Sequence, residues 1–148
     1  MKKIKHIFFD LDATLWDFEK NSQEALHEMF HQDDMNIKCG VDFETFHFEY
    51  KKINAELWRL YGLHEVTKEE LRYQRFHQTF KNFKLNQLDL AMQWADNYVF
   101  ISPRKTNLIH GAIDILDYLK PNYDLHIITN GFKEAQEIKF ECCNLKPY

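Results

Sequence analysis

The feature that most constrains this 148-residue chain is a short apolar run near its N-terminus that ends in two aspartates. Residues 4–11 include three consecutive apolar side chains at positions 7–9, a pattern typical of a parallel strand buried on both faces. Asp10 and Asp12 come at the carboxyl end of this predicted strand. Because open α/β sheets bind ligands at that end of their strands, the sequence predicts an α/β fold with a polar site close to the N-terminus.

A second apolar run, residues 125–129, ends in Thr129 and is followed by Asn130 and Gly131. The threonine provides a hydroxyl at the end of a predicted buried strand, and the glycine permits a tight turn into a helix expected from Lys133 to Cys142. The unpaired N–H groups at the start of such a helix bind phosphate oxygens well. The same pattern also fits an ordinary junction between a strand and a helix.

Between the two strands, apolar residues recur at spacings of three and four, which predicts helices. Two of the helices begin with capping patterns, Asn21 with Glu24 and Thr67 with Glu70. Four helices are expected to cover about residues 21–31, 42–61, 67–83 and 88–100. A fifth, from Leu108 to Leu119, leads back to the second strand.

These elements follow one another as a βαβα pattern with a helical bundle inserted into the first crossover. The sequence therefore predicts a partial Rossmann-like core, with an incomplete parallel sheet, from residues 1–15 and 103–148. Residues 16–102 are expected to form a separate helical domain of four helices.

The two aspartates lie two residues apart, so in an extended strand both side chains would point to one side. Two convergent carboxylates suit a hard cation such as Mg²⁺. They also suit two roles in one reaction, in which one carboxylate attacks phosphorus and the other transfers a proton. An Asp-x-Asp pattern alone also fits a solvated loop after a strand.

Together these features resemble the haloacid dehalogenase superfamily. Its first motif, D-x-D-x-T/V, matches residues 10–14, with Thr14 as a supporting residue and Ala13 where glycine is commoner. Its second motif, an apolar strand that ends in Thr or Ser, matches residues 127–129, and the helical insert matches the superfamily's α-helical cap. Three segments look most like the house-cleaning 5′-nucleotidases that act on pyrimidine nucleotides, namely residues 12–18, 105–108 and 128–132.

The resemblance implies a phosphohydrolase in which Asp10 is the nucleophile that forms an aspartyl-phosphate. Asp12 would act first as the general acid and then as the base for the attacking water. Thr129 would bind the transferred phosphoryl group, helped by backbone N–H groups of Asn130 or Gly131. Mg²⁺ would bind a carboxylate oxygen of Asp10 and the main-chain carbonyl of Asp12. The expected substrate is a small phosphorylated metabolite such as a nucleoside monophosphate.

Two further motifs of the superfamily are expected after one more strand: a lysine that neutralises the nucleophile and phosphate, and an acidic pair that completes the Mg²⁺ site. Lys139 and Lys146 are not expected to reach the carboxyl edge of the sheet. The sequence therefore predicts a C-terminally truncated or partial chain that is inactive and poorly stable by itself. A non-catalytic remnant that serves as an interaction module, and a phosphotransferase or mutase, remain alternative functions.

A different motif, His-Glu-x-x-His at residues 27–31, is the pattern of zinc proteases. On a helical wheel, however, His27 and His31 face away from the apolar side that Leu26 and Phe30 form. A zinc protease is therefore not the favoured interpretation.

Composition limits the partners and the compartment. The net charge is −4 and no basic stripe is present, so a nucleic-acid partner is not expected. The three cysteines form no C-x-x-C pair, which disfavours a disulfide framework or a zinc knuckle and favours a reducing cytoplasm. The N-terminal apolar run stops at Asp10 and is too short for a signal peptide or a membrane span.

Overall fold

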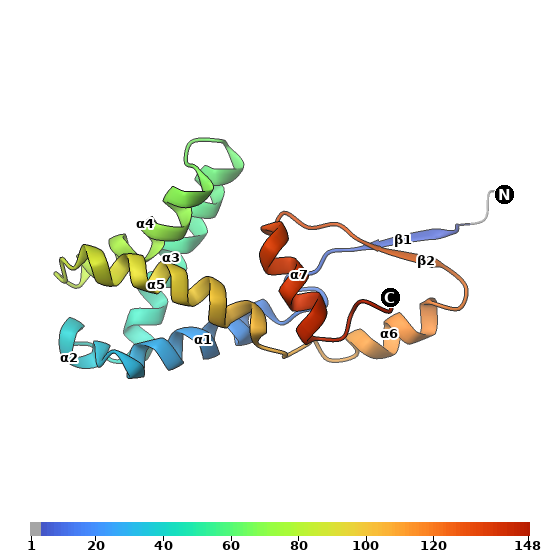
Figure 1. Cartoon of the computed structure of the whole chain (residues 1–148), viewed down its shortest axis with the longest axis horizontal. Coiled ribbons are helices and arrows are strands. Elements are labelled where there is room, and N and C mark those ends of the chain that lie inside the picture. The colour runs from blue at the N-terminus through green and yellow to red at the C-terminus, as the bar shows by residue number, and fades with distance from the viewer. Residues whose placement is uncertain (1–3) are drawn as a thin grey trace. The chain divides into compact units, whose positions relative to one another are not determined.

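A computed structural model describes residues 4–148 of the chain. Within it the chain forms two compact units, drawn in Figure 1. The sheet-bearing unit consists of the residues up to Glu24 together with 101–148, and the helical unit consists of residues 25–100.

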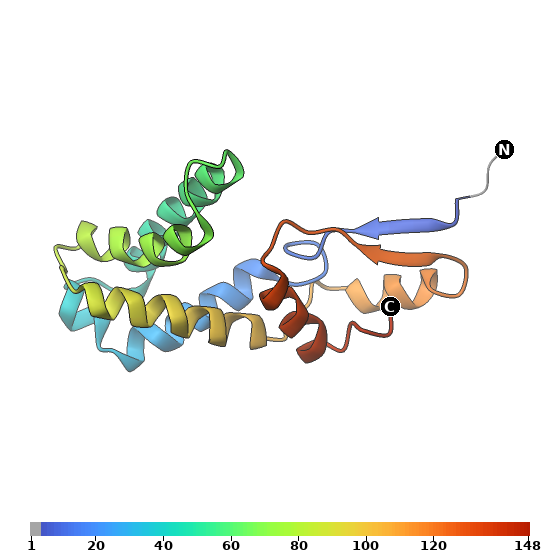
Figure 2. The same cartoon turned by 45° about the horizontal axis from the view of Figure 1, so that its top comes forward.

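The sheet-bearing unit is built on two parallel strands, β1 (His6–Phe9) and β2 (Asp124–Ile127). They pair from His6 opposite Asp124 to Phe9 opposite Ile127, and both views show them side by side although they come from opposite ends of the chain (Figures 1 and 2). A parallel pair needs a long crossover connection, which the inserted helices provide.

Helices α6 (Ala112–Leu119) and α7 (Lys133–Cys142), a short 3₁₀ helix η1 (Ser102–Arg104) and the start of α1 (Phe18–Gln32) complete this unit. Its core is a cluster of buried side chains from the loop after β1, from α6 and from the C-terminal segment. The cluster comprises Leu11, Leu15, Trp16, Ala112, Leu116, Cys143 and Leu145.

The prediction that the first strand is buried on both faces is wrong. Phe9 and Ile127 pack against the core cluster, whereas Phe8 is 63% exposed and stacks on His126. In the part of the chain that the structure describes, only one face of the two-stranded sheet is covered by the core. The three consecutive apolar residues 7–9 therefore predicted more burial than this strand has in the structure.

The predicted start of the first helix is also wrong. Helix α1 begins at Phe18, because the carboxylate of Asp17 accepts the N–H of Lys20 at 3.1 Å and caps the first turn. Asn21 and Glu24, the expected capping pair, instead contact Asn107: the Asn21 amide donates to its carbonyl at 2.8 Å, and Glu24 accepts from its side chain at 2.9 Å. The predicted capping contact between Asn21 and Glu24 is thus replaced by contacts of both residues with Asn107, more than 80 residues away in the sequence.

Helix α6 begins at Ala112, four residues later than predicted. Leu108 pairs with Trp16 in an isolated antiparallel bridge, and the N–H of Ile109 donates to the carbonyl of Leu15 at 2.9 Å. Gly111 then adopts a φ of 80°, a left-handed conformation that a helix cannot continue through. The segment before Ala112 is thus tied to the loop after β1.

The helical unit contains α2 (Met35–Cys39), α3 (Phe43–Gly62), α4 (Lys68–Asn82) and most of α5 (Leu88–Ile101), together with the C-terminal part of α1. The bounds of α3, α4 and α5 agree closely with the predicted helices. Helix α2 was not predicted, because five residues between two left-handed positions, Asp34 and Gly40, are too few to show a period.

Aromatic packing holds the helical unit together. The fully buried Trp94 meets Phe46, Phe76 and Phe80 edge-on, with ring centroids 5.6, 5.6 and 5.3 Å away, a geometry that aromatic pairs prefer. Its indole N–H donates to a carboxylate oxygen of Asp33 at 2.6 Å. Across residues 4–148, no helix has the length and apolar character needed to span a membrane.

The predicted capping box of α4 is confirmed. Glu70 N–H donates to Thr67 Oγ1 at 3.2 Å, and Thr67 N–H donates to the Glu70 carboxylate at 2.7 Å. We expect Thr67→Ala to lower the free energy of unfolding by about 1 kcal/mol, because one N–H of the first turn loses its acceptor. Denaturant titration of the chain measures this difference. Thr67→Ser keeps the hydroxyl and is the matched control; equal stability of the alanine and serine variants would contradict the prediction.

Candidate active site

The loop after β1 is held in a tight, well-defined shape. The N–H groups of Thr14, Leu15 and Trp16 all donate to the carbonyl of Leu11, at 3.3, 2.9 and 2.9 Å, and both Leu11 and Trp16 are fully buried. Ala13 has a φ of 61°, a left-handed conformation that glycine adopts at lower cost. That conformation explains why glycine suits this position, and it shows that alanine is accommodated there.

The two aspartates occupy different surroundings. Asp10 is exposed and makes no hydrogen bond or ion pair with any residue in the range 4–148. Asp12 is half-buried, and its carboxylate accepts from Lys139 Nζ at 2.5 Å and from Gln136 Nε2 at 2.8 Å. Because β1 ends at Phe9, strand alternation does not extend across the pair, and the common direction of the two side chains stays a prediction.

The prediction that Lys139 cannot reach this edge of the sheet is wrong. Its side chain is 9% exposed, and Nζ contacts Asp12 and also lies 4.0 Å from the centroid of the Trp16 ring. Burial lowers the pKa of Lys139 from its ordinary value, while the negative charge of Asp12 acts in the opposite direction. Lys146, by contrast, pairs with Glu141 at 2.6 Å on the surface, which agrees with the prediction that it does not reach the site.

Thr129 follows β2, and its hydroxyl lies in the same cluster of contacts. Thr129 Oγ1 accepts from Gly131 N–H at 3.1 Å and from Gln136 Nε2 at 2.7 Å. The Gly131 N–H is therefore engaged within the protein in this structure. The N–H of Asn130 donates to no acceptor among the described residues and is therefore a free backbone donor in this turn.

The structure thus brings Asp12 and Thr129 together through α7. Thr14 is exposed, and its N–H serves the loop rather than the site. No sequence motif predicted that Gln136 and Lys139 belong to this site. In the sequence, Gln136 and Lys139 are distinguished only by their spacing of three on a predicted helix, which places two polar side chains on one helical face. This pattern does not indicate that the face is buried.

Two oxygen donors in the loop fit a magnesium ion. The Asp10 carboxylate accepts no hydrogen bond within residues 4–148, and no backbone N–H in that range donates to the main-chain carbonyl of Asp12. Mg²⁺ binds through one or two carboxylates together with substrate phosphate and water, so a small protein donor set is sufficient. No group of three or more His, Cys, Asp or Glu side chains within the described residues could hold a metal by itself.

The His-Glu-x-x-His segment lies on α1 in the helical unit. His27 and His31 are exposed with their Nε2 atoms 3.1 Å apart, whereas Leu26, Met29 and Phe30 are buried. This arrangement confirms that the histidines face away from the apolar side of the helix.

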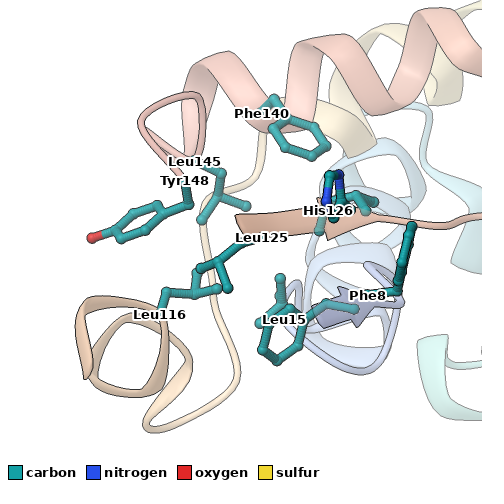
Figure 3. A pocket seen from close by; sticks show the side chains of 10 residues that line it. Phe8, Leu15, Leu116, Leu125, His126, Phe140, Leu145 and Tyr148 are labelled. Carbon is teal, nitrogen blue, oxygen red and sulfur yellow. The ribbon is translucent and has the colours of Figure 1, made fainter. Parts of the chain in front are cut away.

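A separate apolar cavity of about 390 Å³ lies in the sheet-bearing unit (Figure 3). Its walls come from Leu15 of the loop after β1, from α6 and α7, from the two strands and from the C-terminal segment. Neither aspartate nor Thr129 lines it. The cavity is therefore distinct from the carboxylate cluster.

Comparison with known proteins relates the chain to a large enzyme family. Residues 4–148 match the family model of the haloacid dehalogenase-like hydrolases. The chain is 30% identical over 145 residues to the pyrimidine 5′-nucleotidase PynA of Streptococcus pneumoniae, and 29% identical over 145 residues to the pyrimidine 5′-nucleotidase YjjG of Escherichia coli. These alignments cover 97% and 96% of this chain, and 58% of each relative.

Among solved structures, the chain is similar to the Bacillus subtilis protein YfnB, crystallised with bound magnesium. The TM-score is 0.86 at 28% identity, over 99% of this chain and 62% of that one. The chain thus spans about 60% of the length of the relatives it matches.

Proposed function

Because the chain belongs to the haloacid dehalogenase-like hydrolase family, we propose that it carries the catalytic aspartates of a Mg²⁺-dependent phosphomonoesterase that forms an aspartyl-phosphate. The predicted α/β fold class, an incomplete Rossmann-like core with inserted helices, is confirmed. The observation that carries the proposal is the contrast between an exposed Asp10, which forms no hydrogen bond or salt bridge within residues 4–148, and a half-buried Asp12 that is held by two side chains. Two carboxylates in different environments can perform two different roles.

In the first step a carboxylate oxygen of Asp10 attacks phosphorus. The new P–O bond forms as the bond between phosphorus and the substrate's ester oxygen breaks, and the leaving oxygen takes a proton from the carboxyl group of Asp12. The dephosphorylated alcohol then departs, and the phosphoryl group remains on Asp10.

In the second step a water molecule attacks the same phosphorus atom. Asp12, now a carboxylate, takes a proton from this water, and the P–O bond to Asp10 breaks. Both carboxyl groups return to their starting states, and inorganic phosphate leaves. Mg²⁺ held by the Asp10 carboxylate and the Asp12 carbonyl would offset the repulsion between carboxylate and phosphate.

Thr129 is suited to donate a hydrogen bond to the transferred phosphoryl group. Its oxygen already accepts from Gly131 and Gln136, so both lone pairs are used and the hydroxyl proton is left for an outside acceptor. The free N–H of Asn130 is a second donor in the same turn.

We assign the substrate to the small phosphorylated metabolites, and within these to nucleoside monophosphates. The support is the similarity to two proteins named as pyrimidine 5′-nucleotidases, together with a turn that leaves the Thr129 hydroxyl proton and the Asn130 N–H available to a phosphoryl group. The assay is release of inorganic phosphate from nucleoside monophosphates. It uses the 148-residue chain and a chimera in which the chain is followed by the C-terminal part of YfnB that it does not cover; the TM-score of 0.86 supports this junction.

We expect phosphate release by the chimera to require Mg²⁺ and to be independent of zinc. Activity should fall to background in EDTA, return on addition of Mg²⁺, and persist with a zinc-selective chelator when Mg²⁺ is saturating. The His27→Ala/His31→Ala double variant should keep full activity, because both side chains are exposed on α1. Loss of activity in the zinc chelator would refute the metal assignment.

A further inference from the structure

Two buried polar side chains of α7 are not explained by packing alone. Counted as whole residues, Gln136 and Lys139 are 5% and 7% exposed, although both have polar groups that prefer water. They lie three residues apart on one helical face, and both reach the loop after β1. Burying a lysine ammonium group costs free energy unless the group is paired with an opposite charge, so the residue that pairs with Lys139 indicates why the lysine is buried.

Gln136 connects the two halves of the site. Its Nε2 has two hydrogens and uses both, one to Asp12 Oδ2 at 2.8 Å and one to Thr129 Oγ1 at 2.7 Å. The amide therefore turns its nitrogen toward Asp12, whose Oδ2 accepts this hydrogen bond. The amide oxygen is left buried without a partner, which shows that these two contacts set the orientation of the side chain.

Lys139 holds the other oxygen of the same carboxylate. Its Nζ lies 2.5 Å from Asp12 Oδ1 and sits over the buried ring of Trp16. Gly131 leaves the necessary room, because a Cβ at this position would collide with the amide of Gln136. Both oxygens of Asp12 are therefore fixed from α7.

We propose that Gln136 and Lys139 are positioning residues that clamp the carboxylate of Asp12 and the hydroxyl of Thr129 in one arrangement. This α7 clamp rests on the proposed function. It keeps the group that transfers the proton and the group that binds the phosphoryl oxygen at a constant separation. Small displacements of reacting groups cost large factors in rate, so the clamp acts on turnover rather than on substrate binding.

The first test examines the contact itself on the 148-residue chain. Asp12→Asn, Lys139→Met and the double variant are unfolded with denaturant. If the ion pair exists, the shift in midpoint of the double variant differs from the sum of the two single shifts. Additive shifts would overturn the clamp. This result does not depend on any enzymatic activity.

The second test examines the positioning role in the chimera. Gln136→Met and Lys139→Met should each lower kcat roughly tenfold or more with little change in KM, and Lys139→Arg should restore part of the loss. Gly131→Ala should behave like Gln136→Met, because it displaces the same amide. Lys133→Met, an exposed position on the same helix, is the matched control with unchanged kcat.

The decisive comparison places the same substitutions in an Asp12→Asn background. If the clamp acts through Asp12, Lys139→Met lowers kcat there by less than about twofold, since residues that act as a unit are not additive. A full tenfold loss in both backgrounds would indicate a general structural role and overturn the proposal. If the chimera hydrolyses no phosphomonoester at all, the proposed function fails, and the unfolding cycle still decides whether the clamp exists.

Discussion

Replacing Asp10 with asparagine should abolish phosphate release from nucleoside monophosphates. The amide has nearly the same size as the carboxylate but cannot form an acyl-phosphate, so the first step has no nucleophile. We expect the rate of the chimera to fall on the order of 10³-fold or more, as is usual when a covalent nucleophile is removed. Colorimetric detection of inorganic phosphate with saturating Mg²⁺ measures the loss.

Two variants of the same loop show whether this loss is specific. Asp17→Asn should leave activity unchanged, because Asp17 caps α1 and asparagine caps equally well. Asp12→Asn should slow turnover severely while leaving the nucleophile in place. Full turnover by the Asp10→Asn protein would contradict the aspartyl-phosphate mechanism.

The 148-residue chain by itself should hydrolyse nucleoside monophosphates at least about a hundredfold more slowly than the chimera. Lys139 is the cation that reaches the loop, and its ammonium group is held by Asp12 rather than by Asp10. Within residues 4–148 Asp10 forms no salt bridge and interacts with Lys139 only through its charge, so the repulsion between a bound phosphate and Asp10 would be only weakly offset. Assay of both proteins at equal concentration tests this expectation, and comparable rates would contradict it.

The same chain should also be less stable in its sheet-bearing unit than in its helical unit. Two parallel strands with an exposed Phe8 bury little apolar surface, whereas the helical unit encloses Trp94 among aromatic rings. Hydrogen exchange should protect amides of α3 and α5 for longer than those of β1 and β2. Greater protection of the strands would refute this order of stability.

Local sequence patterns were sufficient for several elements that are stabilised by their own residues. The capping box of Thr67 and Glu70 places the start of α4, Asp42 caps α3, and α7 has the bounds that were predicted. The loop of Asp10 and Asp12 and the turn of Thr129 were also recognisable, because each follows an apolar run directly. In these segments the neighbours that matter are within four residues along the chain.

Long-range contacts decided the remaining features. The sequence predicts that Asn21 caps the first helix, but the Asn21 side chain binds Asn107 and α1 begins three residues earlier. In the same way, the hydrogen bond from Ile109 to Leu15 keeps residues 108–111 out of the helix, so that α6 begins only at Ala112. Such hydrogen bonds join segments more than 80 residues apart in sequence, so no periodicity or capping rule can reveal them.

The sequence by itself determined the fold class, the candidate catalytic residues Asp10 and Asp12, and the candidate phosphate-binding residue Thr129. Only the tertiary structure showed that Gln136 and Lys139 hold Asp12, and it reversed the expectation that Lys139 lies out of reach. The physical reason is that the parallel pairing of β1 and β2 brings one face of α7 against the loop after β1. Burial there turns an amide and an ammonium group, which would be ordinary on a solvated helix, into the partners of a carboxylate from the other end of the chain.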